Sequence, residues 1–185
     1  MATISTGTSL SMTFFMRKFY DGDTKAYKSA TRSSYSQNNL SYKDSQALHK
    51  AAKKLSSYKF NTDENESSVR STVLAYVNTY NNALSSSSSS KSHEVSRFSK
   101  QFKSLSNKYS DALEDVGISV NKDGSLKVSE TLLEKTSNEK LQKVFGKDSE
   151  FLRSVKSLSR RMSNNSSELL YTELTGAGGT IDLAL

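Results

Sequence analysis

Apolar residues recur at every third or fourth position through most of the chain, which is the spacing of one buried face of an α-helix. This spacing predicts long helices over residues 41–58, 64–84, 91–116 and 148–171. The pattern is clearest in 91–116, where steps of three and four form a seam like that of a coiled coil. The seam consists of Val95, Phe98, Phe102, Leu105, Tyr109, Leu113 and Val116.

Residues 117–128 depart from helical spacing, because apolar and polar side chains alternate after Gly117. Alternation is typical of a strand with one buried face, so this segment is predicted to form a small β-hairpin. Its turn is expected within residues 121–124, which consist mostly of turn-forming residue types.

The register of this hairpin follows from which apolar residues share a face. A two-residue turn would place Val120 and Leu126 on opposite faces. A three-residue loop that ends at Gly124 instead pairs Val120 with Leu126, and Ile118 with Val128, on one face. It also gives the glycine the left-handed conformation that this loop requires, so we predict the three-residue loop.

Shorter elements are predicted on either side of the long helices. Residues 13–35 contain an apolar stretch that suggests a short helix, broken near Asp21 and Gly22. Ser129 is predicted to begin one short helix after the hairpin. A second one is predicted over 138–145, with a serine before it as the cap and a glycine after it as the stop.

We expect one elongated unit with flexible ends. Residues 1–12 are rich in Ser and Thr and are predicted to be a disordered leader, 13–172 the helical bundle, and 173–185 a flexible tail. The run Ser85–Ser90 is predicted to be a flexible link, because serine favours caps and turns over helix interiors. The predicted fold class is therefore mainly α, an elongated bundle of coiled-coil-like helices with one small β-hairpin at 117–128.

The composition favours an elongated bundle over a compact sphere. The 185-residue chain is 34% hydrophobic, below the usual share of a globular domain, and a narrow helical seam needs fewer apolar residues. Without proline, long helices can run without kinks, and without cysteine there is no disulfide, thiol nucleophile or thiolate zinc site. No apolar run reaches the length of a membrane span, so membrane insertion is not expected. The first ten residues also lack the features of a conventional signal peptide.

The charge pattern gives a weak indication of partners. The formal net charge is +7, and basic charge of this size can indicate nucleic acid or an anionic surface. However, the Lys and Arg residues are spread along the chain among serines and acidic residues, as on ordinary solvated helix faces. Nucleic acid is therefore an unlikely partner on this pattern.

The sequence contains no recognisable catalytic motif. Its two histidines, His49 and His93, lie among Lys and Ser residues, and neither belongs to a zinc-protease pair. There is no nucleophile elbow or phosphate-binding loop, and the glycines at 176–179 follow a predicted helix instead of a strand. We therefore expect no enzymatic activity, no catalytic residue, no cofactor, no metal site and no small-molecule substrate.

Residues 73–145 resemble the C-terminal helical region of the flagellar filament cap protein family, also called flagellar hook-associated protein 2. The matching segments are a helix over 73–84, a helix end and hairpin over 112–126, and leucine-rich short helices that end at residue 145. In the family these segments follow each other in the same order and at similar spacing. The positions that carry the motifs and their packing are Val77, Tyr80, Asn81, Leu84, Leu113, Gly117, Ile118, Asp123, Gly124, Leu126, Leu133 and Phe145.

The resemblance implies a non-catalytic structural protein of the bacterial flagellum, either cap-like or hook-associated. Such a protein would be exported without a cleavable signal peptide and assembled outside the cell. It would act by helix packing with itself, with flagellin or with other axial flagellar proteins. The family's amino-terminal motif and its large surface domains are missing here, so the resemblance covers only about 40% of the chain.

Two other classes of function stay open on the sequence alone. One is a small cytoplasmic helical binding module, such as a secretion chaperone. The other is a basic nucleic-acid-binding helical protein. Detection in sheared filaments would favour the flagellar role, and retention in the cytosol beside one secreted client would favour the chaperone.

Residues 119–130 overlay the twelve-residue calcium loop of an EF-hand at several positions, including Asp123 and Glu130. Two substitutions argue against calcium binding, because the first ligand position holds Ser119 and the ninth holds Lys127. Losing a carboxylate and adding a cation both weaken a site for a hard cation. The alternation of apolar residues also fits a hairpin without any metal.

We therefore predict that the protein has no calcium site of micromolar affinity at residues 119–130. Calorimetric titration of the protein with calcium chloride should give no saturable heat at these concentrations. A saturable site that disappears in an Asp123→Asn variant would contradict the prediction.

Overall fold

The structure is a computed structural model, and it describes residues 6–60 and 66–176. It confirms the predicted fold class, because these residues form a helical bundle with one two-stranded antiparallel sheet. The longer helices are α1 (Thr6–Phe19), α3 (Gln37–Ser56), α4 (Glu66–Ser88), α5 (His93–Lys108) and α9 (Glu150–Gly176). The short elements are α2 (Thr24–Tyr27), the 3-10 helix η1 (Arg32–Ser34), α6 (Ser110–Glu114), α7 (Glu130–Lys135) and α8 (Asn138–Phe145). The strands are β1 (Ile118–Val120) and β2 (Leu126–Val128).

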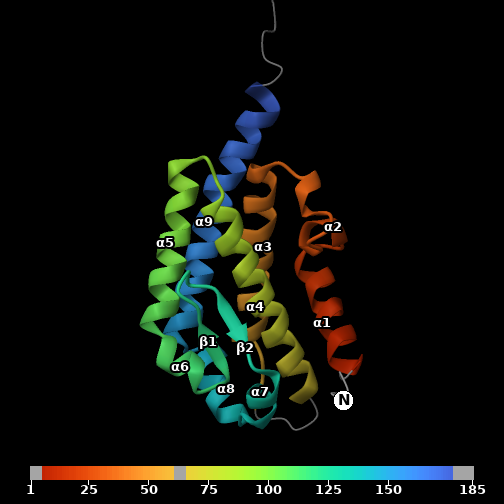
Figure 1. Cartoon of the computed structure of the whole chain (residues 1–185), viewed down its shortest axis with the longest axis vertical. Helices are drawn as coiled ribbons and strands as arrows, with labels where there is room; N and C mark the ends of the chain where they lie inside the picture. Colours follow the sequence, from red (N-terminus) through yellow and green to blue (C-terminus); the bar gives the residue numbers. More distant parts are fainter. Residues whose placement is uncertain (1–5, 61–65, 177–185) are drawn as a thin grey trace, which may run out of the picture.

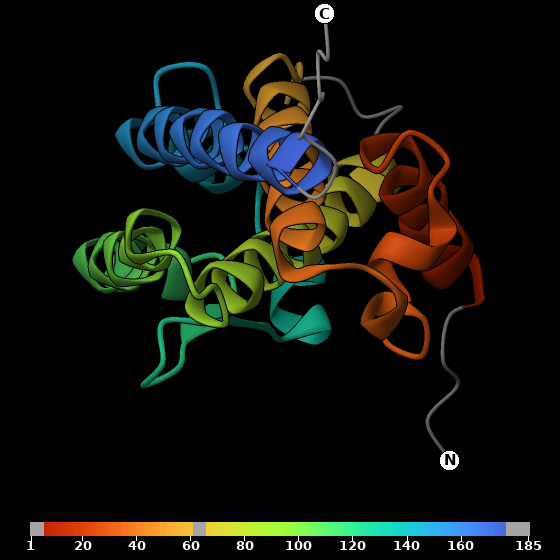
Figure 2. The same cartoon turned by 90° about the horizontal axis from the view of Figure 1, so that it is seen from above.

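The bundle is elongated, with α4 at its centre (Figure 1). Helices α1, α3 and α5 and strand β2 all contact α4, and α9 packs against α3 and α5. Seen from above, α1 and α9 lie on opposite sides of the bundle (Figure 2). The hairpin and helices α6 to α8 gather toward one end, and the last turns of α9 extend past the other end (Figure 1).

Helix α4 is buried around almost its whole circumference. Between Val69 and Ser87 only Asn78 and Ser85 are exposed. Many of its buried residues are small or carry a hydroxyl group, which lets neighbouring helices approach closely. The hydroxyls bond to carbonyl groups of the same helix, as Thr79 Oγ1 does to Tyr76 O at 2.8 Å. Burial therefore does not leave these serine and threonine hydroxyls unpaired.

The expected flexible link at Ser85–Ser90 is wrong, because α4 continues to Ser88. Ser86 and Ser87 are buried, and the Ser87 hydroxyl donates to the carbonyl of Ala83 at 2.7 Å. Helix α3 also contacts this turn, since Gln37 Nε2 donates to the carbonyl of Ser86 at 2.6 Å. Tertiary packing thus overrides the weak helix propensity of serine.

The expected single helix over 91–116 is also wrong, because the chain breaks at Tyr109 and continues as α6. Tyr109 has φ −110° and ψ 19°, outside the helical range, and its ring lies 5.5 Å from that of Phe151 on α9. The break turns the chain toward β1, where Leu113 and Val116 are buried. A straight helix would carry these two residues away from the hairpin.

The chain ends differ from the expected boundaries as well. Helix α1 begins at Thr6, inside the segment expected to be a disordered leader, and it packs against α4. Its end near Asp21 and Gly22 is confirmed, since both have left-handed backbones with φ 52° and 83°. Helix α9 continues to Gly176, inside the expected tail. Residues 1–5, 61–65 and 177–185 lie outside the described residues.

The predicted hairpin register is confirmed, with Val120 opposite Leu126 and Ile118 opposite Val128. Gly124 has φ 89°, as the three-residue loop requires. The short helix predicted over 138–145 is also found at those bounds, capped by a serine hydroxyl and followed by a glycine. These local predictions depend only on the alternation of side chains between the two faces of a strand and on the residue types that turns and helix caps require.

We predict that Gly124→Ala destabilises the protein more than Gly22→Ala does. Both glycines are left-handed, so each substitution costs about 1–2 kcal/mol in backbone strain. A Cβ at Gly124 would also lie 2.7 Å from Cα of Lys103 on α5, whereas a Cβ at Gly22 meets nothing within 4 Å. Urea unfolding of the two variants measures the difference, and equal losses would show that the hairpin does not touch α5 in solution.

Candidate functional site

The residues that carry the resemblance to the cap family come together as one packed unit around α4. All twelve lie on α4, α6, the hairpin, α7 or α8, or at the junctions between these elements. All of them except Asn81 and Asp123 are buried. Tyr76 on α4 packs edge-on against Phe145 of α8, with ring centroids 5.5 Å apart. The motif residues thus form a packing interface and not an open site.

Asn81 joins α4 to the hairpin through its side-chain amide. Its Nδ2 donates to the carbonyl of Leu126, and its Oδ1 accepts from the amide of Leu126, both at 2.8 Å. In an antiparallel pair the residues alternate between bonding to each other and pointing outward. Leu126 points its backbone groups outward, so Asn81 takes the place of a residue on a third strand. Asn81 is one of the positions that carry the resemblance to the cap family, but the pattern of residues did not indicate its hydrogen bonds to the hairpin.

The other motif residues hold the hairpin against α5 and α7. The hydroxyl of Ser106 donates to the carbonyl of Gly124 at 3.1 Å, and Tyr80 OH donates to the carbonyl of Phe102 at 2.8 Å. At Gly117 an added Cβ would lie 2.8 Å from Cβ of Leu132, so only glycine fits there. The hairpin therefore packs against its neighbouring helices, including α4 and α5.

Asp123 is occupied in shaping the hairpin turn. Its Oδ1 accepts from the hydroxyl of Ser125 at 2.7 Å and from the amide of Ser125 at 2.9 Å. These two hydrogen bonds stabilise the charged carboxylate and lower the pKa of Asp123. A ligand at this loop would have to compete with them.

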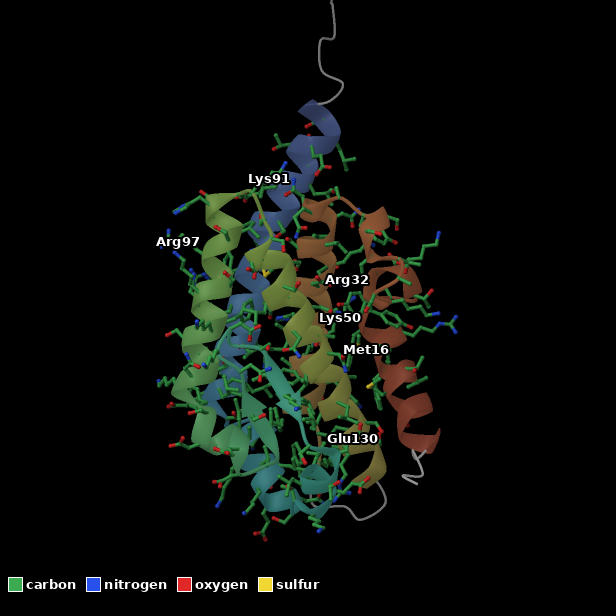
Figure 3. All side chains as sticks on the ribbon, viewed as in Figure 1. Met16, Arg32, Lys50, Lys91, Arg97 and Glu130 are labelled. Carbon is green, nitrogen blue, oxygen red and sulfur yellow. The ribbon has the colours of Figure 1, made fainter. Side chains whose placement is uncertain are left out.

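A second cluster, which the sequence analysis did not identify, anchors the N-terminal segment to the bundle. Arg32 on η1 makes two hydrogen bonds to the fully buried carboxylate of Asp44 on α3, at 2.9 and 2.7 Å. Tyr20 OH donates to the same carboxylate at 2.7 Å, and Asn82 Nδ2 on α4 donates to Tyr20 OH at 2.9 Å. Figure 3 shows Arg32 in the strip between α3 and the N-terminal helices.

The electrostatics of this cluster favour a charged ion pair. Burial would lower the pKa of Arg32, but the hydrogen bonds and the charge of Asp44 outweigh it, and the pKa is raised. Burial, followed by the charge of Asp44, also raises the pKa of Tyr20. The one sequence signal for this cluster was Asp44 itself, since it lies four residues before Leu48 on the apolar face of α3.

Two outer ion pairs reinforce the attachment of this segment. Lys43 lies 2.9 Å from the carboxylate of Asp23, which also accepts from Tyr35 OH at 2.8 Å. Burial would raise the pKa of Asp23, but the hydrogen bonds from Lys43 and Tyr35 outweigh this effect and lower it. Lys50 of α3 pairs with Asp21 in the same strip (Figure 3).

The two histidines occupy different parts of the fold. His93 is the exposed first residue of α5, and His49 Nδ1 lies 3.1 Å from the carbonyl of Lys156. His49 and Ser163 line one groove of about 270 Å³, but no hydrogen bond joins them within the described part of the chain. Residues 6–60 and 66–176 contain no group of three or more His, Asp or Glu residues placed to hold a metal ion.

Two larger grooves lie on either side of α5. One, of about 420 Å³, lies between α4, α5 and the hairpin and is lined mainly by serines, with Lys100 and Lys103. The other, of about 380 Å³, runs between α5 and α9 and contains Leu105 and Leu158.

The exposed apolar side chains lie mainly toward the ends of the molecule. Tyr171 and Leu174 on the last turns of α9 are 70% and 72% exposed, and Phe14 on α1 is 60% exposed. Single exposed apolar residues are common, but Tyr171 and Leu174 are neighbours on one side of a helix that extends past the bundle (Figure 1). None of the described helices is long and apolar enough to cross a membrane.

Comparisons with protein-family models, curated proteins and solved structures give no match for this chain. The resemblance to the flagellar cap family therefore depends on the sequence motifs alone.

We predict that Asn81→Leu destabilises the protein, because it leaves both backbone groups of Leu126 without their partner. An unsatisfied buried group costs about 1–3 kcal/mol, and partial exposure here places the total near the lower end, at about 2 kcal/mol. Asn107→Leu, on the exposed side of α5, is the matched control and should change little. Equal free energies of unfolding for the two variants would show that the Asn81 contact contributes nothing.

Tyr76 and Tyr80 provide a second matched pair. Tyr80 OH bonds to the carbonyl of Phe102, whereas buried Tyr76 OH has no hydrogen-bond partner among the described residues. We therefore predict that Tyr80→Phe lowers the free energy of unfolding by about 1 kcal/mol and that Tyr76→Phe leaves it unchanged or raises it. Denaturant titration at neutral pH tests this, and a larger loss for Tyr76→Phe would contradict it.

The same two tyrosines predict a loss of stability at alkaline pH. Burial raises the pKa of both phenols above the ordinary value near 10. Each phenol has a higher pKa in the folded protein than in the unfolded chain. Its contribution to the free energy of unfolding is therefore complete below about pH 10 and is lost as the pH rises further. Each Tyr→Phe variant should therefore lose less stability than the parent between about pH 9 and pH 11. Parallel losses in parent and variants would contradict this account.

Proposed function

We propose that this protein is a non-catalytic structural component of the bacterial flagellum, cap-like or hook-associated, that acts by packing its helices against other axial proteins. The main support is that the motif residues, which are spread over 73–145, interlock in space around α4. Asn81 of the first motif bonds directly to Leu126 of the second motif. The two motifs therefore work as one structural unit, which is what a shared architecture with the cap family requires.

The end of α9 is the surface that fits this role best. Tyr171 and Leu174 are exposed there, on a helix that extends past the rest of the bundle (Figure 1). Burying an apolar side chain of this size is worth about 1.5–3 kcal/mol, so even a short helical contact with a second copy or with flagellin would be favourable. The proposed partners are accordingly this chain itself, flagellin or another axial protein.

An extracellular location fits the chemistry of the chain. It contains no cysteine, so its folding after export does not depend on the redox state outside the cell. The described fold consists mostly of helices, whose contacts are local and form quickly. A chain that is exported unfolded can therefore fold at its destination without a cofactor or a disulfide.

Filaments sheared from motile cells of the source organism provide the test. We expect antibodies to detect the protein in washed filaments, and to find it lost from the surface of cells that lack the flagellar export ATPase. A cytoplasmic enzyme and flagellin serve as the negative and positive controls. Exclusive retention in the cytosol beside one secreted client would contradict the proposal and favour a secretion chaperone, and retention on nucleic acid would favour a nucleic-acid-binding role.

A double variant, Tyr171→Ser with Leu174→Ser, tests the proposed contact surface. Both side chains are exposed, so the variant should melt close to the parent while its incorporation into filaments falls. The matched control is Phe14→Ser, which removes an exposed apolar side chain from α1 on the other side of the bundle. Equal incorporation of all three proteins would exclude the end of α9 as the contact.

A further inference from the structure

Basic side chains border the groove between α5 and α9. Residues 95–108 on α5 contain four Lys or Arg residues and no acidic residue, and residues 151–167 on α9 show the same composition. The two helices pack side by side. Lys108 lines the groove between them and Arg161 reaches from α9 over α5, whereas Lys100 and Lys103 line the groove on the other side of α5. Lys43 and Lys50 of α3, by contrast, are paired with aspartates.

The basic side chains border an apolar floor. Leu105 and Leu158 lie in the groove, with serines from both helices beside them and Lys108 at one end. Arg97 shares the stripe of α5 that Lys108 occupies, because the two residues are eleven positions apart, or three helical turns. Figure 3 shows Arg97 on the outer side of α5. From α9, Arg161 reaches over the ring of Phe98 on α5, 5.7 Å from its centroid.

We propose that this groove, which we call the α5–α9 groove, binds one amphipathic helix of another protein that carries acidic residues beside an apolar stripe. The apolar stripe would cover Leu105 and Leu158, and the acidic residues would meet Arg97, Lys108 and Arg161. The span from Arg97 to Lys108 is about 17 Å, which is three turns of a bound helix. This inference is independent of the flagellar role and would hold for any axial or chaperone partner.

The floor of the groove argues for a helix over nucleic acid. Phosphate groups need cations but gain nothing from leucine side chains, and single-stranded nucleic acid uses exposed aromatic rings for stacking. In the groove the ring of Phe98 is buried under Arg161. A helix laid between two helices instead uses the apolar floor and the charged rims together.

The test uses three synthetic helical peptides of about 16 residues and fluorescence anisotropy. The first has leucines at every third or fourth position with glutamates on both flanks, the second replaces the glutamates by lysines, and the third replaces the leucines by serines. We expect the first peptide alone to bind the full chain saturably. Its affinity should fall as salt rises, because the rim charges are exposed.

Variants of the chain locate the binding surface. We expect the triple variant Arg97→Glu, Lys108→Glu, Arg161→Glu to bind the first peptide at least about tenfold more weakly. Lys140→Glu, Lys143→Glu, Lys147→Glu changes the charge equally at three exposed positions around α8 and should bind like the parent. Leu105→Ser should also weaken binding, and circular dichroism melts confirm that each variant is folded.

Four results would overturn the proposal. They are equal binding by the two triple variants, equal binding of the serine peptide, no binding of the first peptide at millimolar concentration, and equal competition by a short DNA duplex. The DNA result would assign the face to general polyanion binding. Parent dimers in sedimentation that disappear in the first triple variant would assign the groove to a second copy of this chain.

Discussion

Helix α4 must be buried on nearly every side, although the chain is only 34% hydrophobic. Much of its surface is therefore made of serine, threonine and alanine, whose small side chains allow close approach and whose hydroxyls bond to the helix itself. Serine is a poor helix former because its hydroxyl can bond to the backbone in non-helical conformations, but packing among the neighbouring helices outweighs this preference. The small and hydroxyl-bearing residues of α4 thus fit its central position.

Three consecutive residues of α4 each bond to a different neighbour. Tyr80 bonds to α5, Asn81 to strand β2, and Asn82 to the hydroxyl of Tyr20 at the end of α1. Successive residues of a helix point about 100° apart, so the three bonds radiate around the axis. Loss of one bond would loosen one neighbour and leave the other two in place. The positions that resemble the cap family thus explain much of how the bundle is assembled, and the proposed binding surfaces lie outside this packed unit.

Those outer surfaces are the end of α9 and the α5–α9 groove. They differ in chemistry, because the first presents apolar Tyr171 and Leu174 and the second a basic rim around leucines. The proposed structural role, with more than one partner, would use such separate surfaces. Residues on each surface can be substituted without changing the packed unit around α4. Substitutions of these exposed residues therefore test function separately from stability.

How much the sequence revealed depended on the range of the interactions. The hairpin register and Gly124 were predictable, because side-chain parity and turn chemistry are local. The ends of α4 and α5 were not, since the contact of Gln37 with Ser86 and the turn at Tyr109 depend on packing between distant segments. The ion pair of Arg32 and Asp44 was missed for the same reason, although a lone aspartate on an apolar face was a usable signal.

Native-state hydrogen exchange, measured amide by amide, tests the central position of α4 most directly. We expect the amides of α4 from Val77 to Ser87 to exchange only through global unfolding. The same should hold for the amide of Leu126, which donates a hydrogen bond to Asn81 Oδ1. Their exchange free energies should therefore match the free energy of unfolding measured with denaturant. Rapid local exchange at Ser86, Ser87 or Leu126, while the core of α3 stays protected, would contradict the account.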